Sequence, residues 1–89
     1  MKVAIVYRDF TEYSREVTDW LHDFKKITGY ELETIDPDSI GGEIFCKAHD
    51  VVEYPTIVAL TGSGQVLQMW EGRPLPAFNE VSYYASNVE

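Results

Sequence analysis

The sequence predicts one α/β domain in which helices cover both faces of a mixed four-stranded sheet. The chain has 89 residues, the size of a single domain, and 45% of them are hydrophobic, which favours a packed core. Strand-like and helix-like segments alternate before a strand hairpin and a last helix. The expected order over residues 1–89 is therefore strand, helix, strand, helix, strand, strand, helix, with a right-handed crossover between the first two strands.

The first strand and the first helix are expected near the N-terminus. Residues 2–7, KVAIVY, form an apolar run that is typical of a strand covered on both faces. From Ser14 onward, apolar residues recur at spacings of three and four, which predicts an amphipathic helix. We expect Asp9 or Thr11 to cap its start and Gly29 to end it. Its apolar positions are Val17, Trp20, Leu21, Phe24 and Ile27.

A second strand and a second helix are expected next. Residues 30–35 alternate in part, and residues 36–39, DPDS, read as a turn. Residues 40–49 predict a short helix that contains Cys46, although two glycines stand near its start. The residues that we expect this helix to bury are Ile40, Ile44, Phe45 and Ala48.

The C-terminal part predicts a hairpin and a last helix. Residues 56–60, TIVAL, are separated by the turn TGSG from the strand-like residues 65–70. Gly72 and Pro74 interrupt the chain, and Pro76 is expected in the first turn of the last helix. The apolar positions of that helix are Phe78, Val81, Tyr84 or Ala85, and Val88.

The charge and the cysteine count exclude several classes of function. Fifteen acidic and seven basic residues give a formal net charge of -8, which disfavours nucleic acid and anionic membranes as partners. One cysteine excludes an internal disulfide framework and fits a reducing compartment. The apolar run at the N-terminus is too short for a signal peptide or a membrane span. A cytoplasmic protein is therefore expected.

Two local patterns and the order of elements resemble the thioredoxin fold, at the minimal length typical of glutaredoxins. Residues 51–58, VVEYPTIV, resemble the family segment in which a cis-proline followed by threonine opens the third strand. The glycine-containing hairpin followed by Trp70-Glu71-Gly72 is similar to that of thioredoxins. The resemblance implies a cis bond between Tyr54 and Pro55, and a backbone before that proline that pairs with an extended peptide.

A third pattern marks where the redox chemistry of the family would lie. Thr11-Glu12-Tyr13-Ser14, followed by Arg15, resembles the Cys-Pro-Tyr-Cys plus basic residue of a glutaredoxin, with hydroxyls in both cysteine positions. Thiol-disulfide exchange needs a thiolate, and a hydroxyl has far too high a pKa to replace it. The resemblance thus implies a redox-inactive domain that is not an enzyme.

Two further departures from the family agree with this expectation. Ile5 stands near the position of the buried acid in thioredoxin, where it cannot move a proton. Residues 70–73, WEGR, do not match the pair of glycines and the following acid with which glutaredoxins bind glutathione. Glutathione binding is therefore not expected, and no cofactor is predicted.

The remaining candidate sites favour structural interpretations. Cys46 is expected to be a small buried hydrophobe. His22 and His49 have no metal-ligand spacing and are expected on the surface, so no metal site is predicted. Arg8-Asp9-Phe10, after the first strand, contains no glycine and cannot form a phosphate-binding loop.

The leading hypothesis is a protein-binding or adaptor module. Its groove at the former redox end would hold an extended segment of a partner protein, because a strand end offers backbone donors and acceptors. Two alternatives stay open, an oxidoreductase that uses the single Cys46 and a structural subunit of a larger complex. The predicted groove residues are Phe10, Thr11, Glu12, Tyr13, Ser14, Tyr54, Pro55, Thr56 and Gly72.

Overall fold

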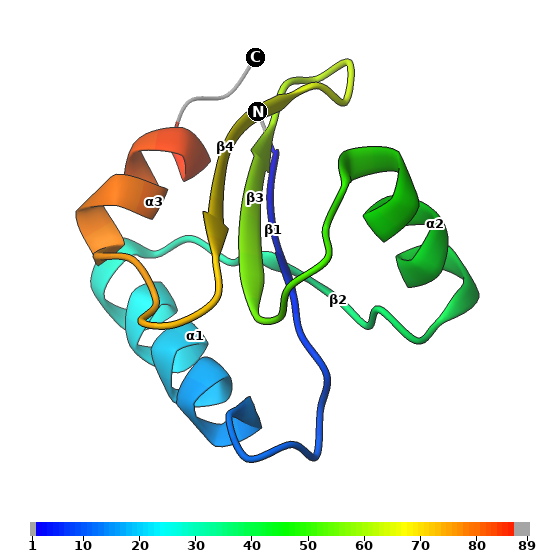
Figure 1. The fold of residues 1–89 in the computed structure, drawn as a ribbon. Helices are drawn as coiled ribbons and strands as arrows, with labels where there is room; N and C mark the ends of the chain where they lie inside the picture. Colours follow the sequence, from blue (N-terminus) through cyan, green and yellow to red (C-terminus); the bar gives the residue numbers. More distant parts are fainter. Residues whose placement is uncertain (1, 87–89) are drawn as a thin grey trace.

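The elements follow the predicted order in a computed structural model that describes residues 2–86. Helices α1 and α3 cover one face of the sheet and α2 covers the other (Figure 1), so the predicted mixed sheet flanked by helices is confirmed. The elements are β1 (Lys2–Val6), α1 (Ser14–Thr28), β2 (Glu33–Ile35), α2 (Ile40–His49), β3 (Thr56–Leu60), β4 (Val66–Glu71) and α3 (Phe78–Ala85).

The sheet has the strand order β2-β1-β3-β4. Strands β1 and β2 pair in parallel, as the predicted crossover requires, and β3 is antiparallel to both β1 and β4. The register places Val6 beside Thr56, and Thr56 beside Glu71. The end of β1, the start of β3 and the end of β4 therefore lie side by side at the same end of the sheet.

Two apolar cores lie on the two faces of the sheet. Successive residues of a strand point to opposite faces, so β1 and β3 contribute to both cores. The core under α1 and α3 contains Val3, Ile5, Val17, Phe24, Ile57, Ala59 and Val81. The core under α2 contains Val6, Cys46, Val51, Val58 and Leu60.

Helix α1 ends as predicted and starts differently. Gly29 has φ 82° and its N–H donates to the Lys25 carbonyl, the left-handed stop expected there. The N-cap is Tyr13, and no side chain caps the helix, so the expectation for Asp9 or Thr11 is wrong. Both side chains make hydrogen bonds within the preceding loop instead.

The last apolar position predicted for α1 is not part of the core. Ile27 is 69% exposed, whereas Val17 and Phe24 are fully buried. At about 100° per residue, Ile27 lies to one side of the stripe that Val17 and Phe24 form. It therefore points past the edge of the core.

Helix α2 buries a different face from the predicted one. Ile40, Ile44 and Ala48 are exposed, and Gly42 and Cys46 are buried, so the expected orientation is wrong except at the half-buried Phe45. The reason lies in a close approach of two backbones. A Cβ at Gly42 would lie 1.7 Å from the Asp36 carbonyl oxygen, so only glycine fits there and this face turns inward.

The second strand and the last helix also differ from the prediction. The second strand comprises only residues 33–35 of the predicted 30–35, and its neighbours are irregular. The N-cap of α3 is Ala77, so Pro76 precedes the helix instead of lying in its first turn. Val88 lies outside the described residues.

Candidate functional site

The predicted groove segments meet at the edge of the sheet where β1 ends and β3 begins. Arg8 connects them, because its backbone N–H donates to the Tyr13 hydroxyl at 3.2 Å and its guanidinium carbon lies 4.8 Å from the centroid of the Tyr54 ring. A third segment joins through Gly72, whose N–H donates to the Pro55 carbonyl at 2.8 Å. We call this region the loop end; it comprises residues 7–14, 36–39, 53–56 and 72–73.

The two hydroxyls in the cysteine positions are hydrogen bonded within their own loop. The Thr11 hydroxyl donates to the Arg8 carbonyl at 3.0 Å, and the Ser14 hydroxyl donates to the Thr11 carbonyl at 2.8 Å. Both are donors to backbone oxygens, which shapes the turn into α1. Glu12, between them, is exposed.

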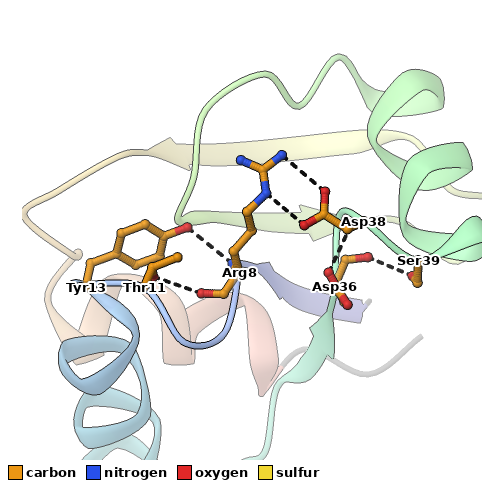
Figure 2. A network of polar contacts seen from close by, with 6 residues as sticks. All are labelled: Arg8, Thr11, Tyr13, Asp36, Asp38 and Ser39. Carbon is orange, nitrogen blue, oxygen red and sulfur yellow. Dashed lines mark hydrogen bonds and ion pairs between the residues drawn. The ribbon is translucent and has the colours of Figure 1, made fainter.

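A fork of charge-assisted hydrogen bonds holds this loop to the turn before α2 (Figure 2). Nε and Nη2 of Arg8 contact the two carboxylate oxygens of Asp38 at 2.9 and 3.2 Å. The hydrogen bond that Arg8 donates to the Asp38 carboxylate raises the pKa of Arg8 above its ordinary value. The Asp38 N–H in turn donates to the Asp36 carboxylate at 2.9 Å. Such bidentate pairs fix geometry as well as charge.

The segment before β3 is ordered by its own contacts. The Tyr54–Pro55 peptide bond is cis, as is Arg73–Pro74. Thr56 is fully buried, and its hydroxyl donates to the Glu53 carbonyl at 2.6 Å. The Tyr54 N–H and C=O have no hydrogen-bond partner among residues 2–86. A strand-forming donor and acceptor therefore remain available beside Pro55.

Gly72 closes the turn after β4 in a conformation that favours glycine. Its φ is 71°, in the left-handed region, and a Cβ there would lie 2.4 Å from a carboxylate oxygen of Glu53. The neighbouring Arg73 places its guanidinium carbon 6.0 Å from the centroid of the Tyr13 ring. Its Nη1 lies 3.6 Å from a carboxylate oxygen of Glu16. This turn thus covers one side of Tyr13.

Phe10 stands apart from these contacts. Its side chain is 97% exposed, and its φ of 58° is unusual for a bulky residue. The Asp9 carboxylate accepts a hydrogen bond from the Phe10 N–H at 3.0 Å, which supports this conformation. The loop therefore presents an aromatic ring to solvent.

Cys46 lies beside Tyr54, one of the loop-end residues. It is buried, as predicted, but it lines a hollow of about 380 Å³ together with Tyr54 and Val52. Burial, and then the neighbouring Cys46 thiol, raise the pKa of the Tyr54 phenol. The hydroxyl end of Tyr54 thus reaches towards the core under α2. Cys46 and Tyr54 belong to different segments, and the fold brings their side chains together.

The two histidines differ in their surroundings. His22 is exposed as expected, whereas His49 is half-buried, with its ring nitrogens 2.9 Å from the Phe45 carbonyl and 3.2 Å from the Gly64 carbonyl. Within residues 2–86, no three His, Cys, Asp or Glu side chains are grouped to hold a metal ion. No described helix combines the length and the apolar character needed to cross a membrane.

A search of solved structures identifies the fold. Thioredoxin 1 from the thermophilic eubacterium Thermosipho africanus TCF52B aligns with a TM-score of 0.67 over 97% of this chain and 96% of that chain, at 17% identity. This protein has a thioredoxin-like fold. No protein-family model and no curated protein matches its sequence. On this thioredoxin-like scaffold, the single Cys46 lies in α2, Thr11 lies in the loop before α1, and Ser14 is the first residue of α1.

Proposed function

We propose that this thioredoxin-like protein is a redox-inactive binding module that holds an extended segment of another protein at its loop end. The N–H and C=O of Tyr54, which are unpaired within residues 2–86, support this proposal. They lie one residue before the buried Pro55, next to the start of β3 at Thr56. An extended segment that pairs with them adds main-chain hydrogen bonds without any change in the sheet, as in other cases of strand addition.

Aromatic side chains supply the apolar part of the interaction. Phe10 is 97% exposed in the free protein, and Tyr13 and Tyr54 are half-buried. Full burial of a phenylalanine side chain contributes about 1.5–3 kcal/mol. Phe10 is therefore the residue with most to gain when a partner covers the loop end. Rigid aromatic anchors of this kind dominate many interfaces.

The chemistry of the site favours binding over catalysis. The hydroxyls of Thr11 and Ser14 donate to backbone carbonyls and are not thiols. Cys46 is only 7% exposed and lies within α2, so its thiol is poorly accessible to a disulfide substrate. The net charge of -8 favours a protein partner over nucleic acid or an anionic membrane. A lone buried cysteine suits a reducing compartment, and we place the module in the cytoplasm.

The proposal is tested with peptides selected for binding to the intact protein. Short random peptides are displayed and selected on the wild-type protein, and the enriched peptides are titrated into ¹⁵N-labelled protein. We expect saturable shifts at Tyr54 and residues 8–14. The variant Phe10→Gly with Thr11→Arg weakens binding by about tenfold or more, which corresponds to about 1.4 kcal/mol.

A matched control separates this site from general stickiness. Ile27→Gln removes an isoleucine that is 69% exposed on α1, outside the loop end, and leaves peptide affinity unchanged. Thermal unfolding verifies that every variant is folded. Peptides that bind the double variant as tightly as the wild type, or that shift residues elsewhere, rule out the loop end as the site.

A further inference from the structure

The outward face of α2 carries large apolar side chains that the described chain does not cover. Ile40 is 83% exposed and Ile44 is 64% exposed. They are four residues apart, so they lie on the same face of the helix, and the exposed Ala48 continues that face one turn further. Single exposed aliphatic residues are ordinary, but a row of them along one helix marks an interaction surface.

Gly41 lies beside this row at a position where the fold does not require a glycine. A Cβ at Gly41 would meet no atom within 4 Å, and its φ lies outside the left-handed region. Glycine is among the poorest helix formers, so alanine would be the better residue for the helix alone. Gly42 differs, because the Asp36 carbonyl excludes any side chain there. A glycine on an outward face lets another backbone approach closely.

A shallow hollow adjoins Gly41 and can receive a side chain. It has a volume of about 330 Å³ and lies between α2 and β2. Gly41 and Phe45 form its helix side, and Ile35 and Asp36 form part of its other side. The face of α2 therefore combines protruding isoleucines with a recess next to them. Helices pack in this way, with ridges of side chains entering grooves.

Charge decides what kind of partner fits this face. Residues 36–53 contain five carboxylates and one lysine, Lys47, which lies 3.2 Å from the Glu43 carboxylate. Arg8 pairs with Asp38, so Asp36, Asp50 and Glu53 are the carboxylates without an ion pair among residues 2–86. A second copy of the chain would bring an equally acidic segment against this one, and like charges would repel. A cationic partner gains from the same field. The carboxylates are Asp36, Asp38, Glu43, Asp50 and Glu53.

We propose that Ile40, Gly41, Ile44 and Ala48 form a docking surface for a cationic amphipathic helix of another protein. The apolar face of that helix packs on the two isoleucines, at the short distance that Gly41 and Ala48 permit. Its lysines and arginines face Asp36, which lines the hollow beside Gly41, and Asp50, the C-cap residue of α2. The surface lies on α2, on the opposite side of the sheet from α1 (Figure 1), and it adjoins the loop end at Asp36.

Three synthetic peptides test the chemistry of the partner. The first is a helical peptide of leucine, alanine and lysine with one apolar face; the second has the same composition in scrambled order; the third carries glutamate in place of lysine. Each is titrated into the ¹⁵N-labelled intact protein. With the first peptide we expect saturable shifts at residues 40–48 and an affinity that falls as the salt concentration rises. The second peptide should bind about tenfold more weakly than the first, and the third should not bind.

Matched variants locate the surface. Ile44→Gln and Gly41→Leu are expected to weaken the first peptide by about tenfold each while the protein stays folded. Ile27→Gln, which changes another exposed isoleucine, and Phe10→Gly at the loop end are expected to leave the affinity unchanged.

Three results would overturn the proposal. Equal binding of the ordered and scrambled peptides would show attraction by net charge alone. Shifts outside residues 40–48 would place the contact elsewhere. Self-association of the wild-type protein in sedimentation, abolished by Ile44→Gln, would assign this face to a second copy of the chain.

Discussion

Phe10 holds a backbone conformation that favours glycine while its ring stays in solvent. Nothing in the described fold offsets this cost except the hydrogen bond from its own N–H to Asp9. Bulky residues in sparsely populated backbone regions occur often at functional sites. The conformation is therefore better explained by the exposure of the Phe10 ring to a partner than by packing within the fold.

Replacement of Phe10 by glycine should stabilise the protein. The left-handed region costs an ordinary residue about 1–2 kcal/mol, and glycine loses part of this gain through the entropy of the unfolded chain. We therefore expect Phe10→Gly to raise the free energy of unfolding by up to about 1 kcal/mol in urea denaturation. Asp50 also has a positive φ, of 56°, but aspartate tolerates it better. Asp50→Gly should stabilise less, and a loss of stability in Phe10→Gly would contradict this account.

Ionisation of the Tyr54 phenol should make the stability of the protein depend on pH above about pH 10. Burial, and then Cys46, raise the pKa of its phenol, so the folded state favours the neutral form. This contribution is complete below the pKa of the unfolded chain, about 10, and is lost as pH rises through the folded value. We expect the thermal midpoint of the wild type to fall more steeply above about pH 10 than that of Tyr54→Phe. Parallel profiles for the two proteins would show that Tyr54 does not contribute.

At the scale of elements, α2 shows how one backbone contact can orient a helix. The apolar residues Ile40, Ile44 and Phe45 predicted one buried face, and the structure buries the face of Gly42 and Cys46 instead. The serine at the helix start agrees with this orientation, because the Ser39 hydroxyl accepts from the Gly42 N–H at 2.9 Å. The cap and the close approach of Gly42 to Asp36 together fix how α2 lies on the sheet.

The two adjacent glycines of α2 should respond to alanine in opposite directions. Gly42→Ala places a methyl group against the Asp36 backbone and should destabilise the protein by about 3 kcal/mol. Gly41→Ala meets no atom within 4 Å and should stabilise it by up to about 1 kcal/mol through helix propensity. Urea denaturation of both variants measures the contrast. Similar effects of the two substitutions would show that the approach of Gly42 does not orient the helix.

At the scale of the whole molecule, the fold does not by itself determine the chemistry of the protein. The sheet order, the helices on both faces and the alignment with a thioredoxin establish the scaffold. A scaffold of this kind can host unrelated functions, so a function has to be argued from particular residues such as those of the loop end. Here those residues offer hydrogen bonds, aromatic surface and charge.

The intact protein should not catalyse disulfide exchange. We expect the reduction of a protein disulfide by dithiothreitol to proceed at the same rate with and without it, because its one thiol is buried in α2. Wild type and Cys46→Ser should give identical rates. Acceleration by the wild type that disappears in Cys46→Ser would instead support an oxidoreductase.

Much of this architecture follows from local patterns. The apolar run of β1, the helical spacing that starts at Ser14, the stop at Gly29 and the hairpin around residues 61–65 predicted their elements, because each depends on residues a few positions apart. The missing cysteine pair was equally visible. The boundaries of β2 and α3 were less accurate, since short elements depend on what they pair with.

What the sequence by itself determined is the order of the elements, their type and the absence of a thiol at the redox position. Only the tertiary structure decided that Arg8 reaches Asp38 and Tyr54, that Cys46 lies beside Tyr54, and that α2 turns its isoleucines outward. The physical reason is the range of the interactions. Periodicity and capping act between neighbours along the chain, whereas these contacts join residues that only the path of the folded backbone brings together.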